Sequence, residues 1–457
     1  MQFRDGSRRL TGKGSVQIAM LVAAALCWAG DTAHAQFRGG FGAGVGGIAI
    51  DADGIVRNLE PQAVESLSQE RRAILGAAKG VEAGEHRKVS LAAVAAAARE
   101  AAAAGKSVPA DVLLLGGLQR VESVFVDPDR HDIVLVGPAD TPIVGPSGVI
   151  VGAASKRPLL QFEDLLVALR AIDGARAGGI RCSIDPTRDG LARLDAFLAQ
   201  QRAVTGSPEP LFRGMEQALG RQTVTVGGVP VDSRFAQVLV AADYRMKRIG
   251  MGLEASGVKQ LPSYLAMIPA GGKASSLPRF WLEAEYDPIA RDPDELAWRL
   301  SGRRMKCLTE SDLAGKDGIQ RGAGQADKAA EKWCAAMTAH YDDLAEKHPV
   351  FAELQNCVDL AVVAALIKGR QLDQRAGLDL GALLDADALP LPKYDVPETV
   401  PTVASGLKKG TAWVLSASGG VQVQPWQFAA NAESAADVAA QRTAALASRP
   451  DAGWWWD

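Results

Sequence analysis

The chain has 457 residues, which is enough for one elaborated domain or for two to three smaller ones. Its hydrophobic content of 47% is typical of a globular protein and excludes an intrinsically disordered chain. The net charge of −3 gives no electrostatic case for nucleic-acid binding, because nucleic-acid-binding proteins carry an excess of Lys and Arg.

Residues 1–35 have the organisation of a secretion signal. A basic region precedes a short apolar run at residues 16–28, and Ala33-His34-Ala35 fits the A-x-A pattern of a cleavage site. The apolar run is too short to span a bilayer, and no later segment has the length and composition of a transmembrane helix. We therefore predict cleavage after Ala35 and export to the periplasm or the cell exterior.

Composition divides the mature chain into four parts. A flexible glycine-rich lead-in at residues 36–47 precedes a main domain at residues 48–388. This domain is expected to form one unit or two subdomains, 48–220 and 221–388. A proline-rich linker at residues 389–410 leads to a hairpin, a helix and a tryptophan tail within residues 411–457.

Helices and β-hairpins alternate in the first part of the main domain. Apolar residues at helical spacing are separated by short strands on either side of turn residues. The predicted elements are helices at residues 60–80, 90–104 and 161–172, and hairpins around Asp53-Gly54 and between residues 121–126 and 133–137.

The loop of the second hairpin contains Asp127, Asp129 and Asp132. Carboxylate oxygens are ligands that calcium prefers, so a calcium-dependent adhesion module is one hypothesis. The glycine and the distal Glu of a calcium loop are missing, however, and Asp is common in turns. A polar turn without a metal is the alternative.

Residues 180–184 are predicted to form a strand that ends at Asp185. An Asp at the end of a strand serves either as a catalytic group or as the cap of the next helix. With Asp243 as an acidic partner, Asp185 is the catalytic candidate for a carboxylate-dependent hydrolase.

The segment at residues 221–267 contains a strand, a tight turn and a long helix. Asp232 or Ser233 is the expected cap, and apolar residues then form a stripe along the helix up to Ile249. Four other side chains form a candidate binding surface for an acidic partner: Arg234, Tyr244, Arg245 and Arg248. The alternative is a solvated basic face with a local Asp243–Lys247 pair.

The second part of the main domain is expected to contain a β-meander and a helical hairpin. The meander comprises residues 279–286, 295–300 and 303–309, and the hairpin comprises residues 325–347 and 349–368. Cys334 and Cys357 lie on the two consecutive helices, so they are candidates for a disulfide. Buried free thiols are the alternative.

The C-terminal part is predicted to contain a hairpin across Gly419-Gly420 and a helix at residues 435–446. Three tryptophans follow at residues 454–456. Such a tail can stack on sugar, lie at a membrane interface or dock in a groove of the same protein.

Several short motifs resemble one protein family. They are GIRCSIDPT at residues 179–187, QTV at 222–224, ADYRMK at 242–247, LPSY at 261–264 and DLA at 359–361. Together they resemble a family of exported proteins from planctomycete bacteria, catalogued as domain of unknown function 1598. The resemblance spans roughly residues 121–368. It implies export and a family-wide domain, and it implies no activity or catalytic residue.

These observations predict a mixed α+β fold of hairpins, a meander, amphipathic helices and a helical hairpin. The H-E-x-x-H and G-x-S-x-G motifs of common hydrolases are missing from the sequence. The leading hypothesis is therefore a non-catalytic binding or structural protein of the cell envelope that needs no cofactor. Its expected partner is an envelope protein or a polysaccharide. The carboxylate-dependent hydrolase and the calcium-dependent adhesion module are the alternatives.

Overall fold

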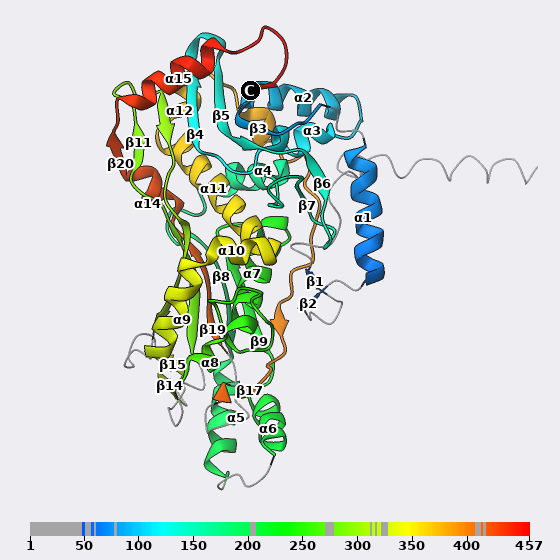
Figure 1. The fold of residues 1–457 in the computed structure, drawn as a ribbon, viewed down its shortest axis with the longest axis vertical. Coiled ribbons are helices and arrows are strands. Elements are labelled where there is room, and N and C mark those ends of the chain that lie inside the picture. The colour runs from blue at the N-terminus through cyan, green and yellow to red at the C-terminus, as the bar shows by residue number, and fades with distance from the viewer. Residues whose placement is uncertain are drawn as a thin grey trace, which may run out of the picture.

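The computed structural model describes residues 48–50, 56–58, 61–76, 80–201, 207–269, 278–310, 313–315, 318–320, 328–406, 413–414 and 417–457. These residues form two large β-sheets and numerous helices, which confirms the predicted mixed α+β fold (Figure 1). The predicted signal peptide and the glycine-rich lead-in lie outside the described residues.

A seven-stranded sheet lies in the upper part of Figure 1. The predicted hairpin of β4 and β5 is confirmed and lies at the centre of this sheet. Neighbouring strands of the sheet are antiparallel, except that β11 and β20 are parallel. β3 was not predicted, because its sequence GEHRKVS is mostly polar. The strand order is β20 (Ala432–Ser434), β11 (Ile289–Arg291), β12 (Ala297–Arg299), β4 (Ser123–Asp127), β5 (Asp132–Ala139), β3 (Gly84–Ser90) and β21 (Trp455–Trp456).

A six-stranded sheet lies below it. The β10–β19 pair is parallel and the other pairs are antiparallel. β19 from the C-terminal part therefore lies inside the sheet, between two strands that precede it in the chain by more than a hundred residues. The strand order is β13 (Arg304–Glu310), β10 (Arg279–Glu285), β19 (Ser418–Val423), β8 (Ile180–Pro186), β9 (Gln222–Gly227) and β16 (Thr399–Val400).

Two helices form the centre of the core. α7 (Arg234–Gly250) begins at Ser233, whose side chain accepts a hydrogen bond from the Ala236 N–H, and it packs on β8 and β19. α11 (Pro349–Gly369) packs against α7, and also against α4 (Phe162–Ala171). Within the described residues α11 is the one helix with the length and composition of a membrane span, but its apolar window is completely buried.

The remaining helices surround this core, and α5 and α6 lie together at one end of the molecule (Figure 1). They are α1 (Pro61–Leu75), α2 (Leu91–Ala103), α3 (Ala110–Leu113), α5 (Arg188–Ala199), α6 (Glu209–Leu219), α8 (Tyr264–Met267), α9 (Lys328–Ala339), α10 (Tyr341–Lys347), α12 (Leu372–Ala376), α13 (Gly381–Leu384), α14 (Pro425–Ala430) and α15 (Asp437–Ala447). Four small two-stranded sheets complete the fold: β1 (Ile48–Ile50) with β2 (Val56–Asn58), β6 (Pro142–Val144) with β7 (Ile150–Gly152), β14 (Leu313–Gly315) with β15 (Gly318–Gln320), and β17 (Ser405–Gly406) with β18 (Trp413–Val414).

Two predicted β-structures are wrong in their pairing. The meander does not form, because β12 belongs to the upper sheet while β10 and β13 pair in the lower one. The turn at Ser301-Gly302 therefore takes the chain from one sheet to the other. The C-terminal hairpin does not form either, because Gly419 and Gly420 lie within β19 itself. The helical hairpin is present, with its first limb divided at His340 into α9 and α10.

Candidate functional site

The predicted basic face of α7 is not a solvent-exposed binding surface. Arg234 is buried and forms ion pairs with Glu163, Asp164 and Glu353. A second buried cation, Arg71, interacts electrostatically with Glu163 and Glu353 and donates to the Gly148 carbonyl at 2.5 Å. Glu163 and Asp164 lie on α4, and Glu353 lies on α11. The packing of these helices against α7 therefore neutralises the charge of Arg234.

This group of five residues, the Arg234 cluster, has more negative than positive charges. Within the described residues one oxygen of Asp164 and one of Glu353 lack a hydrogen-bond partner. Burial raises the pKa of Glu163 from its ordinary value of 4.5 to about 7, against the opposing charge of Arg234. The Tyr394 hydroxyl donates to Glu163 Oε1 and Oε2 at 2.9 and 2.8 Å.

The raised pKa of Glu163 predicts a specific dependence of stability on pH. Between pH 4.5 and about 7 the native protein retains a proton that the unfolded chain releases, so Glu163 makes the free energy of unfolding fall as pH rises. We expect Glu163→Gln to make this decline shallower by up to about 1.4 kcal/mol per pH unit. Urea denaturation at several pH values across this window measures the two slopes.

Glu65→Gln on α1 is the matched control, because this side chain is exposed. It should leave the pH dependence of the wild type unchanged. Equal slopes for Glu163→Gln and the wild type would contradict the assignment.

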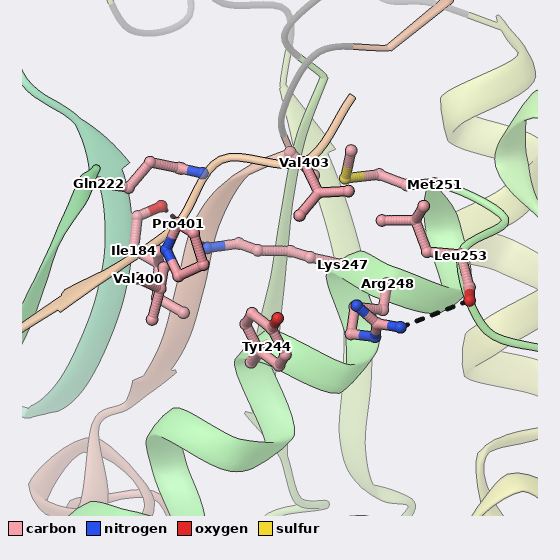
Figure 2. A pocket seen from close by; sticks show the side chains of 11 residues that line it. Ile184, Gln222, Tyr244, Lys247, Arg248, Met251, Leu253, Val400, Pro401 and Val403 are labelled. Carbon is pink, nitrogen blue, oxygen red and sulfur yellow. Dashed lines mark hydrogen bonds between the residues drawn. The ribbon is translucent and has the colours of Figure 1, made fainter. Parts of the chain in front are cut away.

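Arg245, Arg248 and Tyr244 lie further along α7. Arg245 Nε is 3.0 Å from Glu254 Oε1, and Arg248 Nε is 3.5 Å from Glu254 Oε2. Arg248 also lies 5.7 Å from the centre of the Tyr244 ring and donates to the Leu253 carbonyl (Figure 2). Both arginines thus share the single carboxylate of Glu254, and Arg245 is buried.

Tyr244 and Arg248 line a small pocket with the aliphatic part of Lys247, between α7 and the strand end at Val400 (Figure 2). Its volume is about 30 Å³. This volume holds about two water molecules and excludes an organic ligand.

The catalytic candidates Asp185 and Asp243 lie on opposite faces of the six-stranded sheet. Asp243 is completely buried against the core face, where the Lys247 ammonium donates to it at 2.9 Å and to the carbonyls of Ile184 and Gly419. Burial raises the pKa of Asp243 to about 7. Side chains alternate along β8, so Asp185 lies on the side of the sheet opposite to its buried neighbour Ile184. Asp185 therefore lines the sheet face that points away from α7. Thr187, not Asp185, caps α5.

The arrangement of the acidic hairpin loop does not support the calcium hypothesis. Arg449 Nη1 is 3.2 Å from Asp127 Oδ2, and Arg449 Nη2 is 2.8 Å from Asp132 Oδ2. Asp132 also accepts hydrogen bonds from Ser90 and from the backbone of α2. Asp129 is exposed in the turn. Across the described ranges, no group of three or more His, Cys, Asp or Glu side chains has the spacing of a metal site.

The four described cysteines are buried free thiols. The predicted pairing of Cys334 with Cys357 does not match the geometry, because the thiol next to Cys334 is Cys307 on β13, at an Sγ–Sγ distance of 3.4 Å. Cys357 instead interacts with Asp164 beside the Arg234 cluster. The sequence could not indicate the Cys307–Cys334 contact, because it depends on how α9 packs on the sheet.

The tryptophan tail docks on the protein itself. β21 pairs with the edge strand β3, and the Trp456 indole donates to the Ala445 carbonyl at 3.1 Å. The Arg87 guanidinium lies 3.9 Å from the centre of the Trp455 ring. Of the three alternatives for this tail, the docked one describes Trp455 and Trp456.

A larger groove lies on the face of the six-stranded sheet opposite α7. Strand alternation places Phe280 and Leu282 in the core and leaves Trp281, between them, on the opposite face. In the register of the sheet, Trp281 of β10 lies beside Gly420 of β19, and Gly420 lies beside Ser183 of β8. Gly420 has no side chain, and its backbone lines the sheet face together with the Trp281 indole.

This open-face groove has a volume of about 340 Å³. Its polar groups include both hydrogen-bond donors and acceptors, and the Arg279 guanidinium lies 4.7 Å from the centre of the Trp281 ring. A groove that combines a half-buried aromatic ring with polar groups is suited to a flat molecule with many hydroxyl groups. The lining residues are Arg181, Cys182, Ser183, Asp185, Thr225, Arg279, Trp281, Gly419, Gly420, Val421 and Gln422.

The groove was not predicted from the sequence, although the position of Trp281 in its strand indicates an aromatic residue on the polar side. In the strand sequence RFWLEAE the only aromatic residue on the polar side is Trp281. Gly419 and Gly420 are typical of a turn, so their place in β19 beside Trp281 could not be predicted.

The fold and the groove define a mixed α+β protein whose best candidate site is an open sheet face. Residues 182–264 match the model of a family described as a protein of unknown function, DUF1598, which confirms the resemblance to this domain of unknown function for the motifs within that range. The match is narrower than expected and covers β8 to the start of α8. Ser183, Asp185 and Thr225 of the groove lie inside it. No curated protein and no solved structure matches this chain.

Proposed function

We propose that this protein is an exported, non-catalytic binding protein of the cell envelope that recognises polysaccharide at the open-face groove. The half-buried Trp281 indole in the lining of this groove is the observation that carries the proposal. An indole offers a flat apolar surface on which a sugar ring stacks, and the polar groups nearby are suited to its hydroxyls. The secretion signal predicted for residues 1–35 supports export.

The same geometry favours binding over hydrolysis. A glycosidase needs two carboxyl groups on either side of one glycosidic bond, at separations of up to about 10 Å with the substrate between them. Asp185 lines the groove, whereas Asp243 lies behind the sheet and is held by Lys247. A sugar in the groove would therefore meet one of these carboxyl groups and not the other.

Trp281→Ala tests the site. We expect the wild-type protein from the envelope fraction, beginning at Gln36, to be retained on insoluble chitin, cellulose or peptidoglycan. The variant should lose at least tenfold in affinity, since a central aromatic contact contributes about 2 kcal/mol or more. Because Trp281 is only half-buried, the melting temperature of the Trp281→Ala protein should differ little from that of the wild type. Trp281→Phe should restore part of the binding.

Trp454→Ala is the matched control, because Trp454 is also partly exposed but belongs to the tail. It should bind as the wild type does. Loss of binding in Trp454→Ala with retention in Trp281→Ala would move the site to the tail. Failure of the wild type to bind any of the three polymers would overturn the polysaccharide proposal.

A further inference from the structure

A second cavity lies between the outer face of the seven-stranded sheet and α15, and we name it the α15 cavity. Its volume is about 380 Å³. Phe125 of β4 and Val136 of β5 belong to its lining, together with Ala445 of α15. These three residues also belong to a small apolar core that is separate from the main one. One side of the cavity is therefore apolar, while polar and charged side chains form the rest of its lining.

Lys88 of β3 lines this cavity beside the apolar side chains and is 9% exposed. Across the described part of the chain, its ammonium group has neither a hydrogen bond nor an ion pair. Asp457 attracts it electrostatically, but both carboxylate oxygens of Asp457 are bound by Arg87, at 2.6 and 3.1 Å. Burial lowers the pKa of Lys88.

The other charged groups at the cavity leave this charge uncompensated. Arg299 is paired with Asp437, and Glu122 is paired with Arg120. His86, on the same side of β3 as Lys88, adds a second basic group at the rim. Since the Lys88 ammonium forms no ion pair within the described residues, an anion that enters the cavity could pair with it beside the apolar side chains.

We propose that the α15 cavity binds a small organic carboxylate with an apolar body. The carboxylate pairs with Lys88, and the apolar body packs on Phe125 and Val136. This site is on a different sheet from the open-face groove, so its occupation does not depend on polysaccharide binding.

Isothermal titration calorimetry with octanoate and benzoate tests the proposal, with 1-octanol as an uncharged analogue. We expect at least one of the two acids to bind the wild-type chain at least tenfold more tightly than octanol. Lys88→Met should weaken acid binding at least tenfold and leave the stability to heat nearly unchanged, because the Lys88 ammonium forms no hydrogen bond or ion pair within the described residues. Val136→Phe should fill the cavity and weaken binding while Lys88 is retained.

Lys368→Met is the control, because Lys368 is about half exposed and lies on α11. It should bind the acid as the wild type does. The proposal is overturned if neither acid gives binding heat, if octanol binds as tightly as the acids, or if the folded Lys88→Met protein retains wild-type affinity.

Discussion

Arg234→Met should lower the free energy of unfolding by about 3 to 5 kcal/mol near pH 8, which is a large share of the stability of a typical domain. The substitution leaves Glu163, Asp164 and Glu353 buried without the cation that contacts them. Arg71 remains, but burial lowers its pKa to about 10 and it cannot balance three carboxylates. Chemical denaturation of both proteins measures the difference.

The loss should become smaller at lower pH. Burial raises the pKa of all three carboxyl groups, so they take up protons in the variant and the uncompensated charge disappears. Arg248→Met is the control on the same helix, because its side chain is one-third exposed, and it should cost less than about 1 kcal/mol. Equal losses for the two variants would show that the Arg234 cluster is not a stabilising unit.

Gly420→Ala should have an effect of similar or greater size. A Cβ atom at this position would overlap the carbonyl oxygen of Cys182 on β8, which is backbone and has no room to move. β19 would have to separate from β8, and the six-stranded sheet would divide near its middle. We expect a loss of more than about 4 kcal/mol, or protein that is recovered mainly as aggregate.

Gly80→Ala is the control, because it replaces a glycine by alanine without a steric clash. Gly80 has a φ of +76°, and a Cβ atom at this position would have no other atom within 4 Å, so alanine there meets conformational strain without a clash. It should cost about 1 kcal/mol. Unfolding curves of Gly420→Ala and Gly80→Ala that coincide would contradict the close approach of β19 to β8.

Local structure could be predicted because it depends on local signals. The Ser233 hydroxyl and the apolar stripe after it define the start and the length of α7, and the structure has both. Strand alternation likewise predicted the hairpin of β4 and β5. Such signals lie within a few residues of the elements that they specify.

Pairing over long distances could not be predicted in the same way. Arg234 and Arg245 lie beside an apolar stripe, which usually indicates solvent. In this chain Asp164 on α4 pairs with Arg234 in the interior, and Glu254 in the loop after α7 folds back to pair with Arg245. Gly420 shows the same limit, since only the approach of β8 distinguishes a strand glycine from a turn glycine.

The position of β19 also affects how the molecule is made. β8 and β10 emerge from the ribosome first, but the edge of each that faces β19 stays unpaired until residues 418–423 have been synthesised. At ordinary elongation rates this interval is on the order of ten seconds. During that time two unpaired strand edges attract other chains, and a chaperone that shields them would raise the yield of native protein.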